Sequence, residues 1–107
     1  MLDINTIKPL IVEKLLPLNP IKIILFGSYA YGMPNEESDL DICVIEKNVA
    51  SKIKEKAKIR EALKDIKIAK DILVEDEAYF LSHSDANWIN TALYDAQHFG
   101  EVLYEKK

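Results

Sequence analysis

Two short segments stand out in this sequence: LFGSYAYG at residues 25–32 and SDLD at residues 38–41. The run before the first glycine is rich in β-branched residues and predicts a strand over Ile21–Phe26, which Gly27 ends. A short helix expected over Ser28–Tyr31 would leave backbone N–H groups exposed at its start, where anions bind. Gly27 lets the backbone approach a phosphate closely, and the Ser28 hydroxyl adds a donor. Taken alone, the segment is better explained by a plain strand-to-helix turn with a capping serine.

The second segment places Asp39 and Asp41 at the start of another predicted strand, Asp39–Glu46. Side chains alternate along a strand, so both carboxylates point to one face and Leu40 to the other. Aspartate is a poor strand residue, and two neighbouring carboxylates repel each other. A Mg²⁺ ion relieves this repulsion, and it prefers one or two carboxylates together with substrate phosphates. The pair therefore favours a magnesium site over a polar strand entrance that simply faces water.

A third carboxylate, Asp71, opens the next predicted strand, Asp71–Val74. If this strand lies beside Asp39–Glu46, three carboxylates gather and can hold two Mg²⁺ ions about 3.5–4 Å apart. Asp71 would then bind the catalytic metal and draw the proton from the attacking hydroxyl. Four other acids compete for this position: Asp65, Glu75, Asp76 and Glu77.

The remaining elements are expected to be helical. Apolar residues recur at helical spacing over Thr6–Leu16, Ala50–Ile66, Glu75–Ser82 and Ala86–Phe99, and residues 33–38 form a polar loop. This order of elements predicts an α+β fold, a small mixed sheet of about three to four strands covered by helices.

Length and composition narrow the class of protein. The 107 residues suit one domain over residues 1–107, and the net charge of −4 argues against a general polyanion binder. No segment resembles a signal peptide or a membrane span, and Cys43, the single cysteine, cannot form an internal disulfide. Cytoplasmic residence is expected, with Cys43 as a small core residue.

Basic residues are unevenly distributed along the chain. Eight of the 14 lie between Lys52 and Lys70, where only three acids oppose them. The simpler interpretation is the solvated face of a helix. The functional alternative is a docking face for an acidic partner or for nucleic acid.

Gly27-Ser28, followed after ten residues by Asp39-x-Asp41, resembles the signature of the DNA polymerase β nucleotidyltransferase superfamily. More narrowly, the chain is similar to the minimal nucleotidyltransferase (MNT) antitoxins, which are paired with HEPN toxins. The likeness includes the leading helix, the later acid at Asp71 and the ending at residues 99–105. It implies a nucleotidyltransferase fold and a Mg²⁺-dependent enzyme that transfers AMP from ATP onto a tyrosine of the toxin, to which it also binds.

The same resemblance assigns roles to individual residues. Asp39, Asp41 and Asp71 would hold the Mg²⁺ ions, and Asp71 would also activate the acceptor. The residues expected to bind the triphosphate are Gly27, Ser28 and Ser38. Many relatives carry arginine where this chain has Tyr31, which predicts a weaker grip on the phosphates.

Size bears on the acceptor as well. A triphosphate and two metal ions nearly fill the cleft of so small a domain, so the acceptor is expected to bring its own binding surface, as a protein does. Two alternatives stay open: an antitoxin that acts by binding alone, and a transferase that acts on RNA or on a small hydroxylated molecule.

Overall fold

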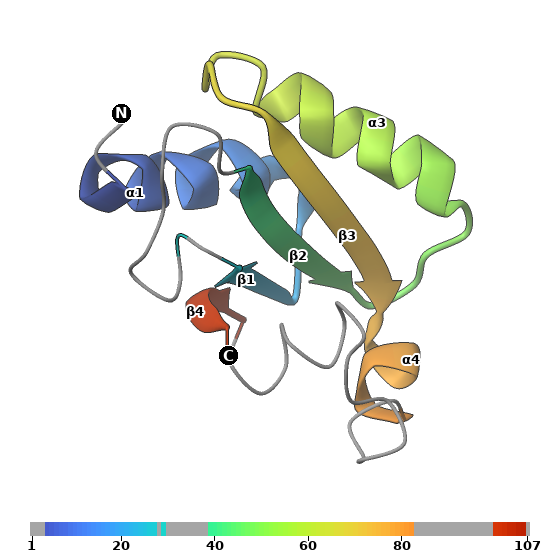
Figure 1. Ribbon diagram of the computed structural model, residues 1–107. Coiled ribbons are helices and arrows are strands. Elements are labelled where there is room, and N and C mark those ends of the chain that lie inside the picture. The colour runs from blue at the N-terminus through green and yellow to red at the C-terminus, as the bar shows by residue number, and fades with distance from the viewer. Residues whose placement is uncertain (1–3, 28, 30–38, 83–99, 107) are drawn as a thin grey trace.

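The computed structural model describes residues 4–27, 29, 39–82 and 100–106 (Figure 1). The helices are α1 (Ile4–Leu15), a 3₁₀ turn (Leu16–Leu18), α3 (Lys52–Ala62) and α4 (Glu77–Ser82). The strands are β1 (Lys22–Phe26), β2 (Leu40–Glu46), β3 (Lys70–Asp76) and β4 (Glu101–Glu105). This arrangement confirms the expected α+β class. The short helix predicted at Ser28–Tyr31, apart from the helical Tyr29, lies outside the described residues, as do the loop at 33–38 and the helix at Ala86–Phe99.

The four strands form one mixed sheet in the order β3-β2-β1-β4. Strand β1 runs antiparallel to both β2 and β4, whereas β2 and β3 are parallel and are connected through α3. Parallel neighbours need such a crossover because the chain must return to the same end of the sheet. The sequence of β4 does not predict a strand, because it lacks the alternation of apolar and polar residues. Its apolar residues, Val102, Leu103 and Tyr104, are consecutive, and a glutamate stands on either side of them.

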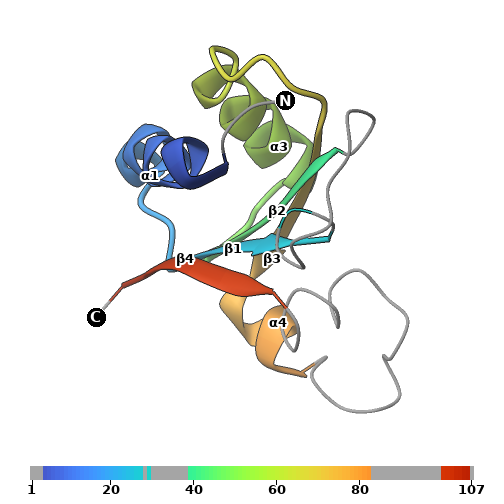
Figure 2. The same cartoon turned by 60° about the vertical axis from the view of Figure 1, so that its left-hand side comes forward.

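The main core lies between the sheet and two helices, α1 and α3, which cover the same face (Figures 1 and 2). Its helical side consists of Ile7, Ile11, Leu15, Ile59, Leu63 and Ile66, and its strand side of Ile23, Leu25, Leu40, Ile42, Val44, Ile72 and Val74. Full burial of one such side chain is worth roughly 1.5–3 kcal/mol, so this face holds the fold together. Figure 2 shows α4 on the opposite side of the sheet, where a smaller cluster contains Ile24, Phe26, Cys43 and Ile45.

Helix α3 is shorter than the predicted Ala50–Ile66. Ser51 caps its start, because the Ser51 hydroxyl accepts a hydrogen bond from the Lys54 backbone N–H at 3.4 Å. The helix ends at Ala62, although Leu63 and Ile66 still reach the core from the turn that follows. Within the described ranges, no helix has the length and apolar character needed to cross a membrane.

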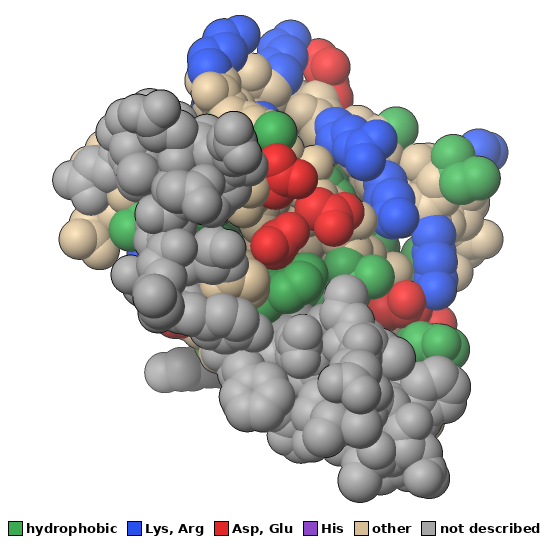
Figure 3. Space-filling model, in the orientation of Figure 1, with side chains coloured by type: hydrophobic (Ala, Val, Ile, Leu, Met, Phe, Trp, Pro, Cys, Tyr) green, Lys and Arg blue, Asp and Glu red, His purple; other side chains and the backbone are tan. Residues whose placement is uncertain are grey.

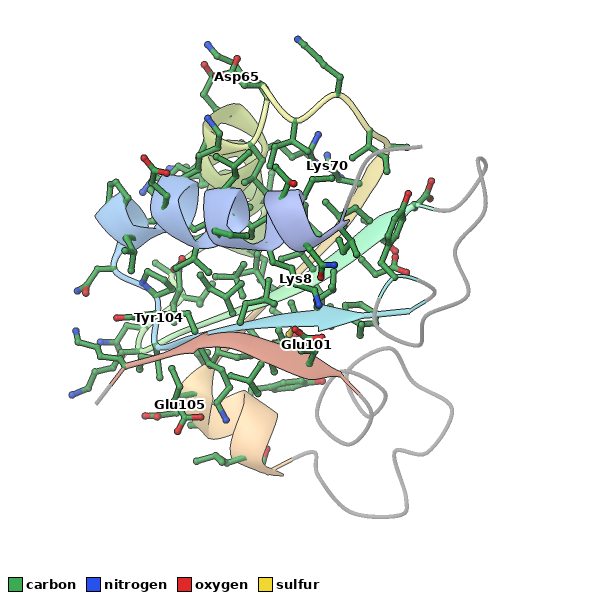
Figure 4. All side chains as sticks on the ribbon, turned by 90° about the vertical axis from the view of Figure 1, so that its left-hand side faces the viewer. Lys8, Asp65, Lys70, Glu101, Tyr104 and Glu105 are labelled. Atoms are coloured by element: carbon green, nitrogen blue, oxygen red, sulfur yellow. The ribbon has the colours of Figure 1, made fainter. Side chains whose placement is uncertain are left out.

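Strand β4 is tied to the rest of the molecule by side chains as well as by its pairing with β1. Figure 4 shows Lys8 of α1 pointing toward Glu101, and the Lys8 ammonium lies 2.9 Å from the Glu101 carboxylate. Lys22 lies 3.3 Å from Glu105 in the same way. Exposed ion pairs of this kind contribute at most about 1 kcal/mol each, so they orient the strand more than they stabilise it.

Candidate active site

The acidic pair lies at the start of β2, on the sheet face that α1 and α3 leave uncovered. Leu40 and Ile42 point into the main core, and Cys43 belongs to the cluster on the opposite face. By strand alternation, Asp39 and Asp41 therefore share the face of Cys43. Asp39 is exposed and Asp41 is half-buried.

Asp71 lies directly beside this pair. Strands β2 and β3 are parallel in a register that makes Asp41 and Asp71 cross-strand partners. Asp71 is exposed on the same face, and the negative charges of both Asp71 and Asp39 act on Asp41, so the three carboxylates lie near one another at one edge of the sheet. Their roles as metal ligands stay a prediction.

The four rival acids lie elsewhere. Asp65 approaches Lys14 of α1 at 3.4 Å, and Asp76 accepts a hydrogen bond from the Tyr79 backbone N–H at 2.7 Å. Glu75 pairs in register with Ile45, towards the other end of the two strands. Glu77 lines a cavity of about 300 Å³ together with Lys47 and Lys106.

The Gly27 turn approaches Asp41 from the other side. Strand β1 ends at Phe26, whose cross-strand partner is Asp41, and Gly27 follows with φ of 74°. A Cβ atom built on Gly27 would overlap the Asp41 Oδ2 atom. Two reasons therefore favour glycine at position 27. It adopts a positive φ without strain, and it has no Cβ atom to occupy the space of the Asp41 carboxylate. Ser28 and Ser38, the other predicted phosphate ligands, lie outside the described residues.

The electrostatics of Asp41 reflect this crowding. Its pKa is raised from 3.8 to about 6, chiefly by burial and then by the negative charges of Asp71 and Asp39. A cation placed between these carboxylates would remove the repulsion. Figure 3 shows acidic side chains gathered over β2 and β3, with Lys and Arg side chains next to them on the α3 side.

Among the described residues, no group of three or more His, Cys, Asp and Glu side chains is arranged to hold a metal ion. The acidic edge offers carboxylate oxygens but no preformed metal cage. Mg²⁺ suits such an edge, because it usually keeps several waters and takes one or two carboxylates plus substrate phosphates. The chemistry of the donors therefore suits magnesium, and Asp39, Asp41 and Asp71 are the residues that would hold it.

Cys43 is not part of the chemistry. It is fully buried and carries a free thiol. Burial, followed by the nearby Glu75 carboxylate, raises the pKa of the thiol to about 12. A thiol in this state is a poor nucleophile, which confirms Cys43 as a core residue.

Two lysines of the basic segment turn out to have structural roles that the sequence pattern does not reveal. The Lys52 ammonium lies 2.8 Å from the buried Glu75 carboxylate and 4.9 Å from the centre of the Tyr79 ring. The Lys70 ammonium donates hydrogen bonds to the backbone carbonyls of Ile66 and Ile68. The basic segment is therefore partly a set of structural contacts and not a single uniform surface.

Sequence comparison identifies the family of this site. Residues 7–93 match the family described as nucleotidyltransferase domain. A protein of Methanocaldococcus jannaschii, named as a candidate protein adenylyltransferase, is 40% identical over 58 residues. That alignment covers 54% of this chain and 58% of the relative, so the chain spans less than two thirds of that protein.

Solved structures share the fold. A toxin–antitoxin complex with AMP-PNP contains a chain of TM-score 0.64 and 20% identity, with coverage of 94% of this chain and 74% of that one. A complex of the tri-AMPylated Shewanella oneidensis HEPN toxin with MNT antitoxin gives a TM-score of 0.59 at 17% identity, covering 95% and 72%. The family match spans most of the chain and includes the acidic edge and the Gly27 turn. This chain therefore belongs to the nucleotidyltransferase domain family.

Proposed function

We propose that this enzyme transfers AMP from ATP onto a tyrosine hydroxyl of a partner HEPN-type toxin in the cytoplasm, and thereby acts as its antitoxin. The observation that carries the proposal is the Asp41–Asp71 register beside Asp39 and the Gly27 turn. Further support comes from the relative named as a candidate protein adenylyltransferase and from the shared fold of chains solved with HEPN toxin.

Each acidic residue has a part in this proposal. Asp39 and Asp41 would hold Mg²⁺ together with Asp71, and the bound metal would supply positive charge to the triphosphate. Gly27, Ser28 and Ser38 hold the phosphates through backbone and hydroxyl donors.

The transfer itself is a single displacement at phosphorus. The tyrosine oxygen forms a bond to the α-phosphorus of ATP, the bond to the β-phosphate oxygen breaks, and pyrophosphate leaves. Asp71 accepts the proton of the tyrosine hydroxyl, since it is the exposed acid of β3 beside Asp41.

The test combines the purified chain, ATP labelled on the α-phosphate, Mg²⁺ and the product of the gene next to this chain's gene. We expect label on a tyrosine of that protein, and no label when EDTA is present or when Asp39 and Asp41 are both replaced by asparagine. A wild-type chain that binds the partner without labelling it would contradict the transfer. If the Asp39→Asn/Asp41→Asn variant still neutralises the partner fully, binding alone is the function.

A further inference from the structure

Helix α3 has more positively charged side chains than form ion pairs within the described residues. Ile59 is its only fully buried residue, and its exposed side is dominated by lysine and arginine. Two neighbouring lysines are partly neutralised, Lys58 by Glu55 at 3.1 Å and Lys64 by Glu61 at 2.8 Å. Within the described part of the chain, Lys54, Lys56 and Arg60 form no ion pair.

Apolar side chains lie among these charges. Ile53 of α3 is 83% exposed, and Leu81 of α4 is 62% exposed. Tyr79 of α4 is also exposed, and the contact of its ring with Lys52 joins α4 to the start of α3. Exposed apolar residues surrounded by charge are typical of protein–protein contact surfaces.

The position of this surface relates it to the proposed chemistry. Figure 3 shows the Lys and Arg side chains on the α3 side next to the acidic side chains over β2 and β3, all on one face of the molecule. A macromolecule seated along α3 would therefore extend over the acidic edge. The structure thus places a charged and partly apolar surface beside the reactive residues.

We propose that the exposed side of α3, with Tyr79 and Leu81 of α4, is the docking surface for an acidic face of the acceptor protein. This inference rests on the proposed function, which requires a protein acceptor. The complementary charge is argued from Lys56 and Arg60, which are four residues apart and share a side of α3 with Ile53, in a chain whose net charge is −4. The apolar contact is argued from Ile53 and Leu81.

A nucleic acid fits this surface less well than a protein does. Ile53 and Leu81 have aliphatic side chains, which offer neither a stacking platform for bases nor charge for phosphates. The adjacent carboxylates of Asp39, Asp41 and Asp71 would repel a phosphate backbone that continued over the acidic edge. An acidic face of a protein, in contrast, can cover α3 alone and stop short of the acidic edge, so that its charges are not repelled by those carboxylates.

The experiment measures binding of the product of the gene next to this chain's gene to three forms of the full chain. These are the wild type, Lys56→Glu/Arg60→Glu on the proposed surface, and Lys47→Glu/Lys106→Glu as a control with the same change in charge at another site. We expect the α3 variant to bind about tenfold more weakly or worse, chiefly through slower association, and the control within about threefold of wild type. Ile53→Ala should weaken binding about fivefold with little effect on association rate.

Four measurements separate this inference from its alternatives. Thermal unfolding of the variants should lie close to that of the wild type, because the other substituted side chains are exposed and the half-buried Lys56 forms no ion pair among the described residues. If the α3 variant and the control bind the partner equally, the docking surface is wrong, even where AMP transfer occurs. If the wild type binds the partner but transfers no AMP, and the α3 variant loses binding, the docking surface is supported and the proposed AMP transfer is contradicted. A labelled single-stranded RNA that binds tightly and depends on Lys56 and Arg60, with partner binding unchanged, would overturn the proposal.

Discussion

Asp41 and Asp71 are cross-strand partners on the parallel strands β2 and β3, although 30 residues separate them in the sequence. On its other side Asp41 meets the Gly27 turn, so it occupies the centre of the site. Two consequences of this position can be measured without any partner protein, because they concern the stability of the isolated chain.

Replacing Asp41 by asparagine should abolish transfer and at the same time stabilise the metal-free protein. The pKa of Asp41 is higher in the folded chain than its ordinary value, so stability falls as pH rises from about 4 to about 6. An asparagine side chain carries no charge and avoids that loss. Because Asp41 is only half-buried, we expect a gain of about 1 kcal/mol at pH 8. Urea unfolding in EDTA at pH 5 and pH 8 measures it.

Addition of Mg²⁺ with ATP provides the control for this prediction. It should raise the unfolding temperature of the wild type and leave that of Asp41→Asn unchanged, because only the native state holds the ligand. An equal shift in both proteins would mean that the metal binds elsewhere.

Replacing Gly27 by alanine should destabilise the protein by about 2 kcal/mol and reduce transfer at least about 100-fold. The added methyl group overlaps the Asp41 carboxylate, and the positive φ is strained for alanine. The overlap can be separated from the strain with the double variant Gly27→Ala/Asp41→Ala. We expect the two stability changes to be less than additive, and strict additivity in urea unfolding would show that the residues do not interact.

Lys52→Met should cost about 1–2 kcal/mol, whereas Lys54→Met should be nearly neutral. Lys52 is the partner of a carboxylate that is almost fully buried, and its loss leaves both oxygens of Glu75 without a partner. Lys54 forms no side-chain ion pair among the described residues, so it serves as the matched control in the same helix. Equal stability of the two variants in urea would contradict a structural role for Lys52.

A second dependence of folding stability on pH is expected from Glu46, which lies on the face of the sheet that α3 covers. Burial, together with hydrogen bonding to Glu55 and its negative charge, raises the pKa of Glu46 from 4.5 to about 7, and Lys58 opposes the shift. The folded chain therefore keeps an extra proton in this range, and stability falls as pH rises through it. Glu46→Gln should be about 1–2 kcal/mol more stable than wild type at pH 8 and equal to it near pH 4.

Thermal unfolding across this pH range checks the prediction, with Glu13→Gln as an exposed control. A parallel pH profile for wild type and Glu46→Gln would show that Glu46 titrates normally.

Much of the site could be predicted from the sequence, because it depends on local spacing. The two-residue interval between Asp39 and Asp41 fixes their common face in any strand, whatever the strand's neighbours. Prediction of the position of Asp71 required one further assumption, that β2 and β3 are adjacent. The connection of these two strands through a single helix favoured this assumption.

Other features depend on long-range register, which local patterns do not contain. The overlap between Gly27 and Asp41 arises only because β1 and β2 pair so that Phe26 faces Asp41. The pairing of Lys52 with Glu75 requires the start of α3 to lie near the end of β3. Strand β4 is short, lacks alternation and is defined chiefly by its pairing with β1.

The alternation along β2 also separates two kinds of mutational tolerance. Leu40, Ile42 and Val44 pack in the core, while Asp39 and Asp41 lie at the candidate site. Substitutions at neighbouring positions of this segment therefore affect different properties of the protein. Core positions can be exchanged among apolar residues without moving a charge, and the acidic edge can be redesigned without opening the core. An engineer could therefore raise the stability of this enzyme and alter its chemistry in independent libraries drawn from one strand and the residue that precedes it.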